Sequence, residues 1–265
     1  MYDSTAKTTK VVLLTICLLA PVTMRADLLV SPSGGSSITP SNPDDGSASR
    51  SLGGTFDFYG DPVDSLFFQV NGFLSTGDAE GFFADRSITT LANDTGTSVI
   101  AGLYDDLIVT GGTSLSDLST GAYYAASWQN IAGDASPSGG TSSFQVLLFF
   151  SAATVDGFSF HSGDIAISYG SLNDAPSGTF TVGVAQNGLN GVGNPMSSDG
   201  QLTNLASLPA GNEFFLYRPD GNSYDVSVQE TSAVPEPRSI GLIGFLMLAY
   251  GFVVFMKKSC ARQLP

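Results

Sequence analysis

Short apolar stretches separated by turn-forming residues dominate the middle of the chain. They are rich in aromatic and β-branched side chains and are bounded by Gly, Asn, Asp or Pro, which is typical of β-strands. In Ile165-Ala166-Ile167-Ser168-Tyr169 the larger apolar residues alternate, so they share one face of a pleat. The pattern predicts strands over residues 55–58, 65–70, 72–75, 98–103, 122–128, 143–151, 164–169, 179–185 and 213–217.

The segment from Phe144 to Phe150 is almost continuously apolar, which predicts a central strand covered on both faces. Within the middle of the chain, no window of helical length keeps an apolar stripe free of Gly and Pro. We therefore expect an all-β fold, a two-sheet β-sandwich over residues 55–230 whose core is largely aromatic. The expected core residues are Phe56, Phe58, Phe67, Trp128, Phe144, Phe149 and Tyr169.

The N-terminal end has the order of an export signal. Lys7 and Lys10 precede an apolar run over residues 11–20, which predicts a signal helix within residues 1–26, cleaved after Ala26. Residues 27–54 follow as a lead-in rich in Ser, Gly and Pro. Because residues 31–51 have little to bury, we expect an exposed loop there.

The C-terminal end combines a linker over residues 231–238, an apolar segment over residues 239–256 and a basic tail over residues 257–265. The apolar segment predicts a single transmembrane helix, and the positive-inside rule places the tail in the cytoplasm. The linker contains Val234, Pro235, Glu236 and Pro237, and the tail contains Lys257, Lys258 and Arg262.

This order of motif, helix and basic cluster resembles the PEP-CTERM sorting signal of Gram-negative bacteria. The resemblance implies that an exosortase-type enzyme in the inner membrane recognises Pro235-Glu236-Pro237, removes the tail, and releases or attaches the ectodomain at the cell surface. The alternative is a plain single-pass anchor, in which the two prolines only end secondary structure before the helix.

Charge narrows the range of partners. The formal net charge is -14 and the pI is near 4.1, with 10 Lys and Arg residues against 24 Asp and Glu residues. All four lysines lie in the terminal segments, so Arg50, Arg86 and Arg218 are the only lysine or arginine residues from Asp27 to Val234. Such a surface excludes nucleic acid as a partner. Cys17 and Cys260 also lie near the ends, which excludes a disulfide framework from the middle of the chain.

Several segments resemble the NIDO domain, the extracellular module first described in nidogen. The most specific are the Val-Asn-Gly-Phe turn at residues 70–73 and the Phe-Gln-Val strand at residues 144–146. The resemblance covers about residues 55–188 and implies an extracellular interaction domain without catalytic residues. It runs in order through residues 56–60, 69–75, 100–106, 123–124, 127–130, 143–148, 165–170 and 181–184.

Two motifs have both a structural and a functional interpretation. Asn71-Gly72 between apolar runs predicts a two-residue hairpin turn, with a ligand-binding loop as the less favoured reading. Asp105 and Asp106 are adjacent, so in an extended strand their side chains point to opposite faces. If the chain bends there, they are candidates for a calcium site, which takes about six to eight oxygen ligands. We expect no other cofactor.

Catalytic constellations are sparse. His161, the only histidine, is expected in an exposed loop, and no serine has the surroundings of an activated nucleophile. Paired carboxylates would allow a secreted glycoside hydrolase, but their separation does not follow from sequence. We therefore expect a protein that is not an enzyme.

The sequence thus predicts an exported protein that is first anchored in the membrane and then reaches the cell surface or extracellular matrix of a Gram-negative bacterium. Its β-domain would adhere to matrix polysaccharide or surface proteins. The alternative is a carbohydrate-binding, lectin-like domain, for which Tyr123, Tyr124 and Trp128 are the candidate ligand-binding residues.

Overall fold

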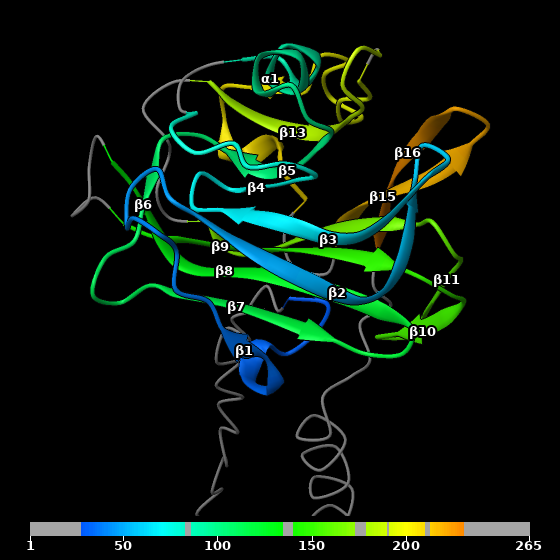
Figure 1. The fold of residues 1–265 in the computed structure, drawn as a ribbon, viewed down its shortest axis with the longest axis horizontal. Helices are drawn as coiled ribbons and strands as arrows, with labels where there is room; N and C mark the ends of the chain where they lie inside the picture. Colours follow the sequence, from blue (N-terminus) through cyan, green and yellow to red (C-terminus); the bar gives the residue numbers. More distant parts are fainter. Residues whose placement is uncertain are drawn as a thin grey trace, which may run out of the picture.

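The computed structural model of the chain describes residues 28–82, 86–134, 140–172, 179–189, 191–209 and 213–230. Across these residues, a pair of large antiparallel sheets packs face to face as a β-sandwich (Figure 1), as the sequence predicts. Among the described residues, no helix has the length and apolar character needed to cross a bilayer. The predicted signal peptide, sorting motif, transmembrane helix and basic tail lie outside these residues.

The larger sheet contains the predicted central strand. Its order is β1-β7-β8-β9-β12-β15-β16, with β6 paired to β8, and β9 lies in the middle with nearly all of its residues buried. The members are β1 (Ser36–Ser37), β6 (Leu107–Ile108), β7 (Ser114–Ser119), β8 (Tyr123–Gly133), β9 (Ser142–Phe149), β12 (Ile165–Leu172), β15 (Glu213–Asp220) and β16 (Ser223–Glu230).

The smaller sheet has the order β14-β13-β5-β4-β3-β2. Its members are β2 (Ser47–Phe58), β3 (Asp61–Gln69), β4 (Phe73–Ser75), β5 (Val99–Tyr104), β13 (Phe180–Ala185) and β14 (Gln201–Leu202). A separate hairpin is formed by β10 (Ala153–Val155) and β11 (Phe158–Phe160), and two short 3-10 helices are η1 (Pro32–Gly34) and η2 (Leu205–Ser207).

Trp128 lies at the centre of the core between the sheets. Its ring stacks on Phe68 of the smaller sheet, with 4.0 Å between centroids, and on Phe144 of the neighbouring strand at 4.8 Å. Its indole N–H donates to the carbonyl of Gln69 at 3.0 Å. A large aromatic residue thus fills the core while its polar atom has a partner. Of the seven predicted core residues, six are buried and Phe67 is partly buried.

The outer face of the larger sheet is also covered. Leu29 packs there in a second apolar cluster, together with residues of the β10–β11 hairpin. This cluster includes Phe149, Phe160 and Phe214. The backbone beside Leu29 is held by Gln145, whose side chain accepts from the N–H of Val30 at 3.1 Å and donates to its carbonyl at 3.1 Å. Burial on both faces explains why β9 is almost continuously apolar.

One α-helix, α1 (Ile88–Thr95), covers the outer face of the smaller sheet (Figure 1). It buries Ile88, Leu91 and Ala92, and Ser87 caps it by accepting from the N–H of Thr90 at 3.2 Å. This helix was not predicted, although the fold is mostly β, as expected. An eight-residue helix is too short to show a sustained apolar stripe in sequence.

All nine predicted strands overlap observed ones, but the predicted lead-in does not stay outside the sheets. β1 and the beginning of β2 lie within residues 27–54, and Ile38 is buried. β7 was also not predicted, because its sequence, Ser-Leu-Ser-Asp-Leu-Ser, is largely polar. β7 lies between the two-residue strand β1 and β8, and its backbone pairing with both does not require an apolar sequence.

Candidate functional site

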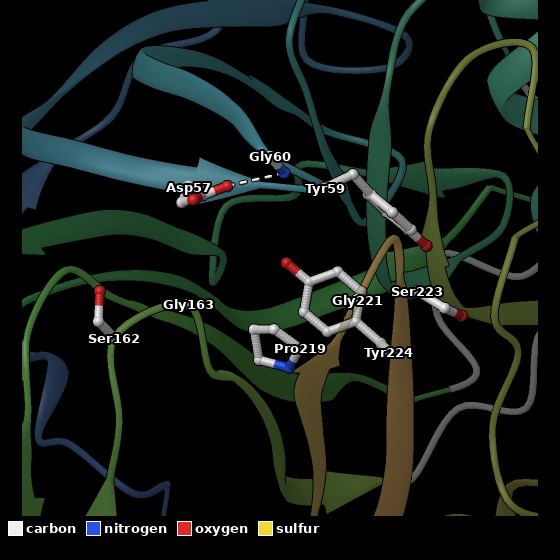
Figure 2. Close-up of a pocket in the computed structure, with 9 residues that line it drawn as sticks. All are labelled: Asp57, Tyr59, Gly60, Ser162, Gly163, Pro219, Gly221, Ser223 and Tyr224. Atoms are coloured by element: carbon white, nitrogen blue, oxygen red, sulfur yellow. Dashed lines mark hydrogen bonds between the residues drawn. The ribbon is translucent and has the colours of Figure 1, made fainter.

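A pocket of about 190 Å³ lies where three connections meet at one end of the sandwich (Figure 2). The connections are the β2–β3 turn, the β11–β12 loop and the β15–β16 turn. We call this cavity the loop-end pocket. It is lined by Asp57, Tyr59, Gly60, Ser162, Gly163, Pro219, Gly221, Ser223 and Tyr224.

The β2–β3 turn presents Tyr59 to the pocket. Phe58 pairs with Asp61, so Tyr59 and Gly60 form a two-residue turn, with φ values of 57° and 87°. Two positive φ angles are the signature of a type I′ hairpin turn. The carboxylate of Asp57 accepts from the N–H of Gly60 at 2.7 Å, and the Tyr59 hydroxyl donates to the carbonyl of Val184 at 3.2 Å.

The β11–β12 loop is fixed by a buried acid. Asp164 is fully buried, and both of its oxygens accept from Arg218, at 3.0 and 2.8 Å. The same carboxylate accepts from the N–H of His161 at 2.8 Å. Gly163 has a φ of 85°, and a Cβ at this position would come within 2.7 Å of Pro219 Cγ. This wall of the loop-end pocket therefore requires glycine.

Tyr224 comes from the β15–β16 hairpin and is only 4% exposed. Its ring meets that of Tyr59 edge to face, with 4.9 Å between centroids. Burial raises the pKa of the Tyr224 phenol well above its ordinary value, so the hydroxyl keeps its proton at physiological pH. Figure 2 shows this hydroxyl directed toward the side where Asp57 and Gly60 lie, with Pro219 near the ring.

A cluster of carboxylates lies at the other end of β2. One oxygen from each of Asp44, Asp45 and Asp106 lies within 4.8 Å of the others, and all three residues are partly buried. Burial raises the pKa of Asp106, and the negative charges of Asp134, Asp44 and Asp45 raise it further. Burial and then the charges of Asp45 and Asp134 raise the pKa of Asp44. We call Asp44, Asp45 and Asp106 the acidic cluster.

The bend after β5 brings one of the two predicted calcium candidates into this cluster. Asp106 joins it, whereas Asp105 is not among its three members. Carboxylate oxygens are the ligands that calcium and magnesium prefer, so the acidic cluster supplies the right donor atoms for such a cation. Asp44 and Asp45 were missed because they lie in a polar segment far from Asp106 in sequence.

The Asn71-Gly72 hairpin is present, but its loop differs from the prediction. Gln69 pairs with Phe73, which leaves three residues in the connection instead of two. Gly72 has a positive φ, whereas Asn71 does not. The Asn71 side chain is buried and links three segments: it donates to Asp45 at 2.8 Å and to the carbonyl of Phe82 at 2.9 Å, and it accepts from the N–H of Leu107 at 2.8 Å. Its role is structural.

The three predicted ligand-binding aromatic residues do not form an exposed patch. Tyr124 and Trp128 are fully buried in the core between the sheets. Tyr123 is partly buried and packs against Phe149 on the outer face, at 5.7 Å between ring centroids. Adjacent residues in β8 point to opposite faces, which separates Tyr123 from Tyr124. The aromatic residues that line the loop-end pocket are instead Tyr59 and Tyr224.

His161 lies in the loop between β11 and β12, with 64% of its side chain exposed, as predicted. Its Nδ1 is 3.8 Å from the carboxylate of Asp164, but that carboxylate is already engaged by Arg218. His161 therefore contributes to the loop that borders the pocket mainly through its backbone N–H, which donates to Asp164.

The fold defines an all-β domain of the sandwich type, and a comparison with family models assigns the chain to a family. The NIDO related family profile matches residues 26–219, which is more than half of the chain, so the chain belongs to the NIDO-related family. The match begins at residue 26 and so includes the whole of the predicted lead-in, residues 27–54, where β1 and the beginning of β2 lie. No curated protein matches the chain. No solved structure matches it either.

Proposed function

We propose that this protein is an exported, surface-sorted bacterial protein whose β-sandwich acts as a non-enzymatic interaction module in the cell envelope or extracellular polysaccharide matrix. The observation that carries the proposal is the NIDO-related match over residues 26–219, because domains of this kind are typically extracellular. It covers the region between the two predicted sorting signals.

The charge distribution supports the same function. The region from Asp27 to Val234 has no lysine and only three arginines. In the structure, each arginine forms an ion pair with an aspartate: Arg50 with Asp117, Arg86 with Asp94, and Arg218 with Asp164. A surface of this sign repels anionic polymers and leaves neutral glycans and cationic surfaces as partners.

Sorting is tested by the intact mass of the protein from the cells that make it. Processing by an exosortase-type enzyme in the inner membrane predicts a product that starts near Asp27 and ends between Val234 and Arg238. A product that retains Cys260 would contradict processing and support a plain membrane anchor. Replacement of Glu236 by alanine should block the cleavage, whereas replacement of Ser232, outside the Pro-Glu-Pro motif, should not.

Matrix binding is tested by co-sedimentation of the full chain, purified in mild detergent, with matrix extracted from the same cells. We expect saturable pelleting. Pelleting that disappears with a chelator would assign a cation-dependent role to the acidic cluster. No pelleting in either condition would refute direct matrix binding.

A further inference from the structure

The last strand of the larger sheet, β16, has one edge that no described strand covers (Figure 1). Among the described elements, only β15 runs alongside it. The two strands pair without interruption from Glu213 and Glu230 to Asp220 and Ser223, so β16 is a regular strand of eight residues without a bulge. The open edge of such a strand presents a row of unpaired backbone groups, to which another extended chain can add.

The other strands at the ends of the two sheets are protected against such pairing. β1 and β14 contain only two residues each. β2 is long, but its pairing with β3 is irregular between Ser51 and Phe56, and the Arg50–Asp117 pair ties it to β7 of the other sheet. Short strands and bulges are the usual means by which natural sheets avoid edge pairing, as are lysine and proline on the edge. β16 has none of these.

The hairpin turn determines which backbone groups of β16 point outward. β15 and β16 are joined by a two-residue turn that Asp220 and Ser223 close. The closing pair of such a turn is hydrogen-bonded, and hydrogen-bonded pairs alternate with non-hydrogen-bonded pairs along an antiparallel ladder. The N–H and C=O groups of Tyr224, Val226 and Val228 therefore point away from β15. They make no backbone hydrogen bond to any other described segment.

The side chains of β16 define what an added strand should carry. Val226 and Val228 pack against the core but are only partly buried, which favours apolar residues beside them. The exposed charged residues of β16 are Asp225 and Glu230, and both are acidic. Arg218, the only cationic residue of β15, is already engaged in its buried ion pair. An added strand would therefore meet apolar side chains on one face and uncompensated negative charge on the edge.

The charges decide between a second copy of the chain and a different partner. A second copy would bring the same acidic strand and the same formal net charge of -14, which disfavours self-association. A cationic strand would instead place lysine or arginine beside Asp225. Both β12 with β15 and β15 with β16 pair antiparallel, and an added strand would continue this arrangement.

We propose that β16 binds an extended segment of a partner protein by antiparallel strand addition, and that this segment alternates apolar residues with lysine or arginine. Backbone hydrogen bonds along the edge supply affinity, and the alternating side chains supply specificity. This inference rests on the proposed interaction function and gives it a surface and a class of partner.

The test is isothermal titration calorimetry of the full chain in mild detergent, with a capped peptide of alternating valine and lysine that is as long as β16. In antiparallel pairing, the valines of the peptide share a face with Val226 and direct their N–H groups toward β16, whereas the lysines direct theirs to solvent. N-methylation of the valines should therefore weaken binding at least about tenfold, a loss of about 1.4 kcal/mol. N-methylation of the lysines should leave the affinity unchanged. Equal affinities of the two methylated peptides, or no binding of the unmodified peptide, would overturn the inference.

Substitutions in the chain provide a second test. Val226→Pro removes an outward N–H without removing a hydrogen bond to β15, so it should abolish peptide binding. Thermal unfolding shows whether this variant folds, and the comparison of the methylated peptides does not depend on it. Asp225→Asn should weaken binding by about two- to fivefold. Asp64→Asn is its matched control, because Asp64 is an exposed acid on β3 of the other sheet. Equal losses for Asp225→Asn and Asp64→Asn would show general charge attraction and contradict the assigned edge.

Two further measurements separate this inference from other occupants and from the proposed function. In sedimentation velocity, a wild-type dimer that Val226→Pro abolishes would assign the edge to a second copy and overturn the inference. Matrix pelleting without peptide binding would refute the strand-addition site and leave the interaction function standing. Peptide binding without matrix pelleting would support the site and refute matrix adhesion.

Discussion

Buried or partly buried acidic side chains lie near both ends of β2, and they differ in whether a cation is paired with them. Near its end, Asp164 is completely buried but has Arg218 as a bidentate partner. Near its start, Asp44 and Asp106 are only partly buried, and the charges that act most strongly on them come from other carboxylates. Asp164 fixes the loop that forms one wall of the loop-end pocket. The carboxylates of the acidic cluster repel one another, and protonation or a bound cation would reduce this repulsion.

The largest effect is expected from removing Arg218, the partner of the buried Asp164. Arg218→Met leaves the buried carboxylate of Asp164 without its counter-charge, which should reduce the free energy of unfolding by about 3–5 kcal/mol. Urea denaturation followed by the fluorescence of Trp128, the only tryptophan, measures this change. Arg86→Met is the control, because its partner Asp94 is 46% exposed and the pair should contribute less than about 1 kcal/mol. Equal losses in the free energy of unfolding for Arg218→Met and Arg86→Met would show that burial of Asp164 does not make its ion pair more important.

A smaller effect is expected from Gly163, which packs against Pro219 beside the same ion pair. Gly163→Ala should destabilise the protein by the cost of a positive φ, about 1–2 kcal/mol, and by a further amount of about 1–3 kcal/mol for the clash with Pro219. Gly157→Ala separates the cost of the positive φ from the cost of the clash, because Gly157 has a φ of 82° and a Cβ there would meet no atom within 4 Å. Thermal unfolding of both variants should rank Gly163→Ala as clearly less stable. Equal unfolding temperatures for the two variants would mean that Pro219 can shift to accommodate the added Cβ at little cost.

The smallest effect, of opposite sign, is expected at the acidic cluster. A carboxyl group whose pKa is higher in the folded than in the unfolded state destabilises the fold as the pH rises through the folded pKa. With a chelator present at pH 7, Asp106→Asn should therefore raise Tm by about 2–4 °C, the change that about 1 kcal/mol produces in a domain of this size.

Lowering the pH sharpens this last prediction. The advantage of Asp106→Asn should shrink as the pH falls toward the unfolded pKa of about 4, because the wild-type carboxyl then becomes protonated. Millimolar calcium provides a second comparison. Stabilisation of the wild type but not of Asp106→Asn would identify the cluster as a cation site. A variant that is less stable than the wild type at pH 7 in chelator would contradict the repulsion.

Nine of the strands could be predicted because each of them carries its own local signal. The apolar run of β9 matches its nearly complete burial. In β12, Ile165, Ile167 and Tyr169 face the core between the sheets, whereas Ala166 belongs to the cluster on the outer face. β7 and the beginning of β2 could not be predicted, because backbone pairing with β8 and β3 and the Arg50–Asp117 pair hold them, and local periodicity does not show these contacts.

The candidate site was harder to predict for a related reason. Tyr59 belongs to a segment that the NIDO resemblance includes, but a tyrosine with positive φ is unusual and hides the two-residue turn. Tyr224 lies in β16, which was not predicted although Tyr224, Val226 and Val228 alternate with polar residues. Only the topology brings the two rings together. Trp128, the most conspicuous aromatic residue in the sequence, was a poor guide because large aromatic residues are usually buried.

The position of Leu29 and Val30 also matters for the solubility of the domain. These residues seal the outer face of the larger sheet and lie just beyond the predicted site of signal cleavage. A protease that trims this end would remove Leu29 from the cluster that also contains Phe149, Phe160 and Phe214, and so expose part of that cluster. An exposed apolar patch of this kind promotes aggregation. Loss of Leu29 and Val30 should therefore make the domain more prone to aggregation.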